Sequence, residues 1–249
     1  MKILYVSLFP EQNNCHEIEN LKYFINSAES TSISNLFTYR LFSCHDQMTK
    51  NLQNIFKCQD CPEDNLFNFK KYNMQVVKLP FDAVYNENMN ERRFHEIAWS
   101  KQRIYMFMKI KKVLDSFDYI FYNDSDIQID ANDIYELCKI LERKNNKIVS
   151  HIVNVPYIIK AKKQVVIDSF GCFILPTEIL NNIIDITPLL YEVIDNNGKL
   201  YRRYDPDWIL RKLLIREGCK EIRGDSCNTK HYLNNNNFYE FDSNKITFN

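Results

Sequence analysis

The chain has 249 residues and is 45% hydrophobic, which is enough apolar material for one large domain or two small ones. Its 32 basic and 32 acidic residues give a formal net charge of zero, which argues against binding nucleic acid or an acidic membrane through overall charge. Only 4 residues are glycine, and none has the spacing of a dinucleotide fingerprint, a Walker A loop or a nucleophile elbow. A nucleotide would therefore have to bind without a glycine-rich phosphate loop.

The predicted elements alternate between strands and helices. The first part of the chain predicts a nearly all-apolar strand, a helix, two strands, a long helix and a strand, at residues 2–9, 18–27, 36–42, 74–79, 91–116 and 119–122. Residues 45–72 are polar and give no clear assignment. The second part predicts a helix, two strands and a helix at residues 132–143, 147–153, 170–175 and 176–184. This alternation is typical of a single α/β domain, and no linker rich in Pro, Gly or Ser divides the chain.

The last predicted helix has defined ends. Asp205 is expected to cap it, Pro206 takes the first helical position, and Gly218 follows the last turn, which ends at Arg216. A short strand is predicted at residues 220–223, and a polar tail follows it.

The cysteines and the first residues bear on the compartment. No stretch approaches the roughly 20 apolar residues of a membrane span, and residues 1–10 resemble a buried strand more than a signal peptide. We therefore expect a cytoplasmic protein in which the 8 cysteines are scattered, reduced thiols. A structural zinc site is the alternative for one subset, Cys44, His45, Cys58 and Cys61.

The most informative stretch is the apolar run that ends in Asn123, Asp124, Ser125 and Asp126. In an extended chain Asp124 and Asp126 point the same way, so both carboxylates can reach one hard cation at the carboxyl end of a strand. Open α/β sheets bind ligands at that edge, and a divalent ion would remove the repulsion between the two charges. The alternative is a polar exit from the strand in which aspartate forms a turn.

This pattern resembles the D-x-D motif of the GT-A glycosyltransferases. It most resembles the glycogenin-like and galactosyltransferase-type families, in which a helix carrying Lys or Arg precedes an apolar strand ending in D-S-D, and the similarity covers roughly residues 95–130. The resemblance implies one GT-A (Rossmann-like) domain over residues 1–249, with a mixed, mostly parallel sheet flanked by helices. Residues 1–130 would be the nucleotide-sugar-binding half and residues 131–249 the acceptor-binding half.

The resemblance also implies a chemistry and its partners. A divalent ion, Mn²⁺ or Mg²⁺, would be held by Asp124 and Asp126 against the diphosphate of a nucleotide sugar, with a UDP-sugar favoured. The acceptor would be a hydroxyl of a glycan or glycoconjugate. The third metal ligand in such enzymes is often a C-terminal histidine, and His231 is the best placed of the 5 histidines, with a surface histidine as the alternative.

The helix before the motif carries a second basic candidate. One apolar face is predicted to hold four residues together with Lys101, namely Phe94, Ile97, Ile104 and Met108. Lys101 either extends its stem outward over that face or has an anionic partner inside. The resemblance implies that this partner is the sugar nucleotide or the D-x-D carboxylates. Arg103 lies off the stripe and is expected to be solvated.

Two later segments resemble the family less closely. Gly171 lies in a segment that resembles the small-residue strand facing donor sugar and acceptor, where a close backbone approach is expected, and a strand-end bulge is the alternative. The Asp205–Asp207 segment resembles an acceptor-side D-Q-D element, with Pro206 in place of Gln, which leaves a retaining or inverting outcome open. Asp207 would orient the acceptor or act as a general base, and Asp205 caps the helix beside it.

The donor side is completed by the end of the first strand. Ser7 and Leu8 resemble the segment that meets the nucleotide, and Ser125 lies between the two carboxylates. Two other functions remain open. One is a haloacid-dehalogenase-type phosphatase, which also places D-x-D after a buried strand, and the other is a non-catalytic carbohydrate-binding or scaffold module.

Overall fold

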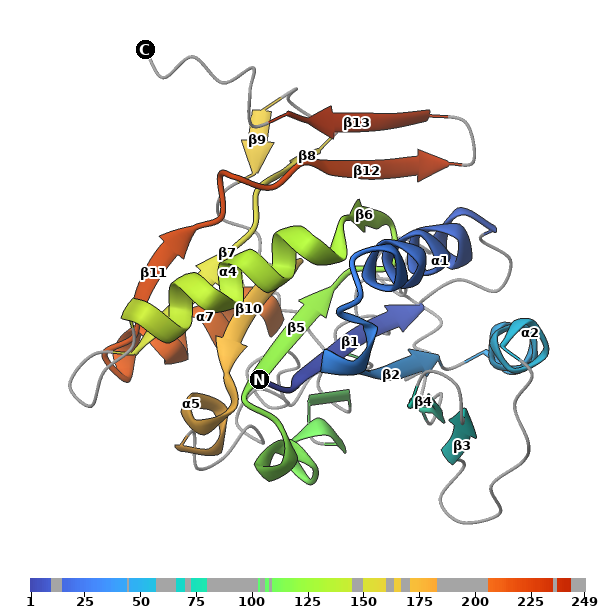
Figure 1. Cartoon of the computed structure of the whole chain (residues 1–249), viewed down its shortest axis with the longest axis horizontal. Coiled ribbons are helices and arrows are strands. Elements are labelled where there is room, and N and C mark those ends of the chain that lie inside the picture. Colours follow the sequence, from blue (N-terminus) through green and yellow to red (C-terminus); the bar gives the residue numbers. More distant parts are fainter. Residues whose placement is uncertain are drawn as a thin grey trace, which may run out of the picture.

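The structure is a computed structural model of the chain. It describes residues 1–9, 15–43, 45–56, 66–69, 73–79, 103, 106–107, 109–144, 150–159, 164–166, 171–182, 206–234 and 237–242. Figure 1 shows a large central sheet with helices on both sides and a small sheet above it.

The central sheet has eight strands and mostly parallel pairing. In spatial order they are β11 (Lys220–Arg223), β7 (His151–Asn154), β10 (Cys172–Pro176), β5 (Tyr119–Asn123), β1 (Ile3–Phe9), β2 (Phe37–Ser43), β4 (Met74–Lys78) and β3 (Leu66–Phe69). Strand β1 runs parallel to both β2 and β5, whereas β10 is antiparallel to both of its neighbours. The predicted α/β class with a mixed, mostly parallel sheet is confirmed.

Helices cover both faces of this sheet because its central strands are apolar on both sides. All seven residues of β1 are buried, and successive residues alternate between two hydrophobic clusters. Helices α1 (Cys15–Ser30), α2 (Asp46–Ile55) and α4 (Ala131–Lys144) contribute to the first cluster. Helices α5 (Thr177–Asn182) and α7 (Pro206–Arg216) contribute to the second, together with Phe107. Short 3₁₀ turns lie at Ser34–Leu36 and Leu114–Ser116.

The predicted polar tail is wrong. Residues after β11 form β12 (Thr229–Asn234) and β13 (Asn237–Phe241), which pair with each other and with β6 (Ile127–Ile129) in a second sheet. Side chains of β6 lie in the first hydrophobic cluster, so this sheet is attached to the main core. A further hairpin joins β8 (Tyr157–Ile159) to β9 (Gln164–Val166).

Several predicted ends agree with the structure. Helix α7 begins at Pro206, and Gly218 adopts φ +86 two residues after the helix ends, as expected for a helix stop. The unassigned polar stretch contains α2 and β3. Of the long helix, residues 103, 106–107 and 109–111 are described and are helical, and residues 91–102 lie outside the description.

Four cysteines are described as buried free thiols, namely Cys138, Cys172, Cys219 and Cys227, in agreement with scattered reduced thiols. In the proposed zinc subset only His45 is described, while Cys44, Cys58 and Cys61 lie outside the description. Within the described part of the chain, every helix is too short or too polar to cross a membrane.

Candidate functional site

The D-S-D motif lies where the central strand β5 ends. All five residues of β5 are buried, and its neighbours are β1 on one side and β10 on the other. The chain then turns, with the backbone N–H of Ile127 donating to the carbonyl of Asp124 at 3.0 Å, and continues into β6. The Asn123 amide fixes this turn by donating to the Ile127 carbonyl at 2.8 Å. The motif is therefore a turn, and the argument from extended-strand alternation does not describe its two carboxylates.

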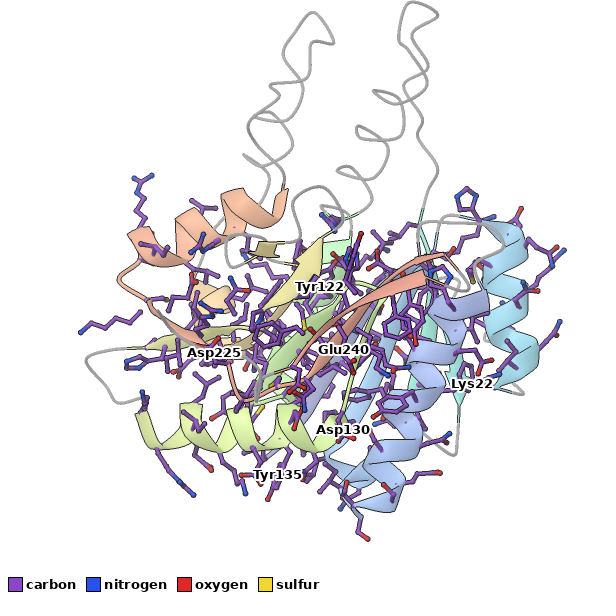
Figure 2. The ribbon with its side chains drawn as sticks, turned by 90° about the horizontal axis from the view of Figure 1, so that it is seen from above. Lys22, Tyr122, Asp130, Tyr135, Asp225 and Glu240 are labelled. Atoms are coloured by element: carbon purple, nitrogen blue, oxygen red, sulfur yellow. The ribbon has the colours of Figure 1, made fainter. Side chains whose placement is uncertain are left out.

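Asp124 lies in a nearly closed pocket of hydrogen-bond donors. One guanidinium nitrogen of Arg103, Nη2, donates to both of its oxygens, at 2.8 Å to Oδ1 and 3.0 Å to Oδ2. The Tyr122 hydroxyl donates to Oδ1 at 2.6 Å. Figure 2 shows Tyr122 inside the fold, whereas Tyr135 lies at its margin on α4. The Asp124 side chain is only 13% exposed, and the guanidinium that pairs with it is 3% exposed, so both partners of this ion pair are largely shielded from water.

Arg103 is buried, so its expected solvation is wrong. Together with Met106, Phe107 and Ile110 it follows the i, i+3, i+4, i+7 pattern of one buried helix face. This face differs from the stripe predicted through Lys101, which itself lies outside the described residues. The same pattern in the sequence could have identified Arg103, because an arginine on an apolar face requires a buried anion.

Gly171 faces Asp124 across the β5–β10 pair. Its carbonyl accepts the Asp124 backbone N–H at 2.8 Å. A Cβ atom built on Gly171 would lie 2.4 Å from Asp124 Oδ2 and 2.6 Å from the Tyr157 hydroxyl oxygen. The expected close approach at Gly171 is present, and the group that comes close in the structure is the Asp124 carboxylate.

Opposing influences act on the pKa of Asp124. Burial has the largest effect and raises the pKa, and the charge of Asp126 adds to that rise. The positive charge of Arg103 and the bonds from Arg103 and Tyr122 act in the other direction. The net direction is a raised pKa for this carboxyl.

Asp126 has a more open environment and a different partner. Its side chain is 35% exposed, and its Oδ2 lies 3.2 Å from His231 Nε2. The Asp126 carbonyl also accepts the backbone N–H of Tyr232 at 2.8 Å. The pairing of β12 with β6 places His231 opposite Ile127, next to Asp126. The structure thus brings together two of the predicted metal ligands, which are 105 residues apart in the chain.

Tyr157 completes this side of the site, and no sequence pattern pointed to it. Its ring meets the His231 ring edge-on, with centroids 5.2 Å apart. The same side chain has its hydroxyl at Gly171. Tyr157 therefore lies between the pocket of Asp124 and the Asp126–His231 pair, and it restricts the orientation of the imidazole.

The side chains at the site could supply only some of the ligands that a divalent cation needs. Asp126 offers carboxylate oxygens and neutral His231 offers an imidazole nitrogen, a combination that Mn²⁺ accepts more readily than Mg²⁺ does. Among the residues that the structure describes, no cluster of three or more His, Cys, Asp or Glu side chains is arranged to hold a metal ion. Two protein ligands fit a metal that takes its remaining ligands from phosphate and water.

The remaining predicted residues are placed as follows. Ser125 is buried, and its carbonyl accepts the Asn20 side-chain amide of α1 at 3.0 Å. Ser7 and Leu8 are fully buried at the end of β1, beside β5, and Leu8 belongs to the second hydrophobic cluster. Asp207 lies in the first turn of α7, but its side chain lies outside the description, as does all of Asp205.

Comparison with known proteins gives only distant likenesses. No family model and no curated protein matches the sequence. A core-mannan synthase of Aspergillus fumigatus (CmsA/Ktr4), solved in an Mn/GDP form, has 11% identity and TM-score 0.48 over 98% of this chain and 81% of that chain. A glycosyltransferase involved in glycosylating the major capsid of PBCV-1 has 8% identity and TM-score 0.46 over 90% of this chain and 82% of that one.

The S. aureus protein TarS in complex with UDP-GlcNAc has 11% identity and TM-score 0.40 over 73% of this chain. The matched region spans about half of that structure, 47% of its chain. At these identities and TM-scores, function has to be argued from the residues of this chain.

Proposed function

We propose that this chain is a metal-dependent GT-A glycosyltransferase that moves a sugar from a nucleotide diphosphate sugar to an acceptor hydroxyl on a glycan or glycoconjugate. The observation that carries the proposal is the contact between Asp126 and His231. Asp126 follows the central strand of a mostly parallel sheet, and His231 reaches it from β12 at 3.2 Å. This pair lies at the carboxyl edge of β5, where open α/β sheets bind their ligands.

The roles proposed for Asp126 and His231 follow from their contact, and the other roles follow from the family resemblance. Asp126 and His231 are the residues that would hold Mn²⁺ or Mg²⁺, and the bound ion would supply charge neutralisation for the departing nucleoside diphosphate. The resemblance implies that Lys101 would add positive charge against the diphosphate. Asp207 would orient the acceptor hydroxyl or accept its proton, with Asp205 as the cap of its helix. A UDP-sugar is the favoured donor, with Gly171 on its side of the site and the fully buried Ser7 and Leu8 supporting that side without contacting the donor.

The test is turnover of nucleotide sugars in Mn²⁺. A panel of UDP- and GDP-sugars is incubated with the wild-type protein, and release of nucleoside diphosphate is measured with Mn²⁺ and with EDTA. We expect Asp126→Asn and His231→Gln to lower turnover by at least about 100-fold, because even groups that only support metal ligands account for roughly 10- to 100-fold.

Matched controls carry the same substitutions at other positions. Asp115→Asn changes an exposed carboxylate, and His151→Gln changes a histidine in β7. Both should keep wild-type turnover. Undiminished turnover in folded Asp126→Asn would contradict the proposed function.

A further inference from the structure

Both carboxylate oxygens of Asp124 already accept hydrogen bonds from protein side chains. Oδ1 accepts from Tyr122 at 2.6 Å and from Arg103 at 2.8 Å, and Oδ2 accepts from Arg103 at 3.0 Å. A carboxylate has about four lone-pair positions, and these contacts occupy most of them. A cation needs an unobstructed lone pair at about 2.0 to 2.6 Å, depending on the metal.

The Gly171 backbone and the Tyr157 side chain lie against the Oδ2 side of the Asp124 carboxylate. Oδ2 lies so near Gly171 that a single added carbon there would be 2.4 Å from the oxygen, and the Tyr157 hydroxyl is packed against the same point. The bond from the Asp124 N–H to the Gly171 carbonyl fixes the backbone in this position. Asp124 is therefore restrained by its main chain as well as by its side-chain partners.

The charge of Arg103, like the geometry around Asp124, disfavours metal binding by the Asp124 carboxylate. The Arg103 guanidinium remains protonated at any physiological pH, and it is almost fully buried beside Asp124. If Asp124 turned to bind a dication, the buried guanidinium would lose this partner and would also lie near two additional positive charges. Separating a buried ion pair is strongly destabilising, because it leaves an uncompensated charge inside the protein. Asp126 has no such constraint, because it is more exposed and faces the imidazole of His231.

Resting on the proposed function, we propose that Arg103 is a positioning residue that keeps Asp124 out of the metal's ligand set. The D-S-D motif then supplies one protein ligand, Asp126, and His231 supplies the other. Asp124 instead forms a neutral buried pair with Arg103, while the turn that carries Asp126 is held by the Asn123 amide and by the backbone N–H of Ile127.

The experiment measures Mn²⁺ binding directly, in the presence of UDP, by the EPR signal of free and bound Mn²⁺. Asp126→Asn and His231→Gln should weaken the Mn²⁺ Kd by more than about 10-fold, whereas Asp124→Asn should change it by less than that. Far-UV circular dichroism establishes that each variant is folded. A folded Asp124→Asn protein that loses Mn²⁺ as strongly as Asp126→Asn would overturn the inference.

Arg103 variants give a second, independent readout. In Arg103→Met the repelling charge is gone and the Asp124 carboxylate is released, so Mn²⁺ should bind more tightly and the EPR spectrum of bound Mn²⁺ should change. Arg103→Lys keeps the charge and should restore the wild-type Kd and spectrum. Weaker Mn²⁺ binding in Arg103→Met would show that Arg103 prepares Asp124 as a ligand, which is the opposite of the inference.

The experiments distinguish failure of the proposed metal-dependent function from failure of the ligand assignment alone. If the wild-type protein binds no Mn²⁺ with UDP present, the metal-dependent function fails and the ligand assignment fails with it. If the wild type binds Mn²⁺ and Asp124→Asn does not, the function stands and only the role assigned to Arg103 and Asp124 is overturned.

Discussion

Asp124 and Asp126 are separated by one residue, yet their surroundings differ in exposure and in charge. Asp124 is bonded to a buried arginine and a tyrosine hydroxyl, and Asp126 lies beside a histidine at the edge of the site. Burial disfavours the charged form of a carboxyl and raises the pKa of Asp124, and the positive charge of Arg103 opposes that rise. At the residue scale, then, the two carboxylates of the motif are suited to different tasks.

The residue that permits this arrangement is Gly171. We expect Gly171→Ala to destabilise the protein by about 1–3 kcal/mol, because the new methyl group must displace Asp124 Oδ2 or the Tyr157 hydroxyl. Displacing Asp124 also disturbs the turn that carries Asp126, so Mn²⁺ affinity should fall. Urea unfolding and Mn²⁺ titration measure the two effects.

Gly218→Ala is the matched control. Gly218 has φ +86 and open space around its Cβ position, so the substitution should cost about 1 kcal/mol of backbone strain and leave Mn²⁺ affinity unchanged. Equal Mn²⁺ affinity in both alanine variants would show that the close approach at Gly171 does not matter for the site.

At this scale the two adjacent carboxylates could be recognised from the sequence, and their metal-binding role stays a prediction, whereas the burial of Arg103 was missed. The carboxylates were identifiable because their chemistry is encoded in adjacent positions. Arg103 was missed because the prediction followed a stripe through Lys101, whose residues lie outside the described part of the chain, and not the face through Phe107, which is buried. Which helix face is buried depends on where the helix meets the sheet.

At the element scale, a partly buried ion pair attaches α7 to the edge of the central sheet. Arg211 of α7 donates to Glu221 of β11 through Nε at 2.6 Å and through Nη2 at 3.0 Å. Two parallel bonds to one carboxylate fix orientation as well as distance. Because α7 begins one residue after Asp205 and contains Asp207, this pair helps set where the proposed acceptor-side segment lies.

A double-mutant cycle measures the strength of this pair. We expect Arg211→Ala and Glu221→Ala to show a coupling free energy of about 1–2 kcal/mol in urea unfolding, because the pair is partly buried and is joined by two hydrogen bonds. The exposed Glu19–Lys22 pair on α1 is the control and should couple by less than about 0.5 kcal/mol. Coupling of similar size in both pairs would contradict a special role for the α7–β11 contact.

Elements with local signals were predicted, and those defined by remote partners were not. Strand β1 is apolar throughout and α7 has Pro206 at its start, so both could be located from neighbouring residues. Strand β6 has three residues and exists because β12 pairs with it from about a hundred residues away. Nothing near β6 in the sequence encodes that partner.

At the scale of the whole molecule, the site combines residues from both predicted halves of the chain. Asp126 belongs to residues 1–130, and His231 belongs to residues 131–249. The second sheet makes this possible, because β12 lies between β6 and β13 and brings His231 to the end of β5. Figure 1 shows β12 and β13 lying together above the central sheet. The C-terminal segment is therefore part of the fold, and its stability should depend on packing.

Two phenylalanines of β13 test this conclusion. Phe241 is 1% exposed, whereas Phe238 is 44% exposed and lies near Tyr232 and Lys230 on the outer face. We expect Phe241→Ala to lower the free energy of unfolding by about 3–5 kcal/mol, as in other large core truncations. Phe238→Ala should lower it by at most about 1 kcal/mol, because it removes only exposed ring contacts.

Urea unfolding monitored by circular dichroism measures both variants, and the comparison is internal because the residue type, the strand and the substitution are the same. If residues after β11 were a polar tail, both changes would leave stability unaltered, since neither ring would be buried in the folded protein. A large loss in Phe241→Ala alone would establish that β13 packs against the body of the protein. Since β13 pairs with the strand that carries His231, the same variant should also weaken Mn²⁺ binding, which EPR can measure at urea concentrations below the unfolding transition.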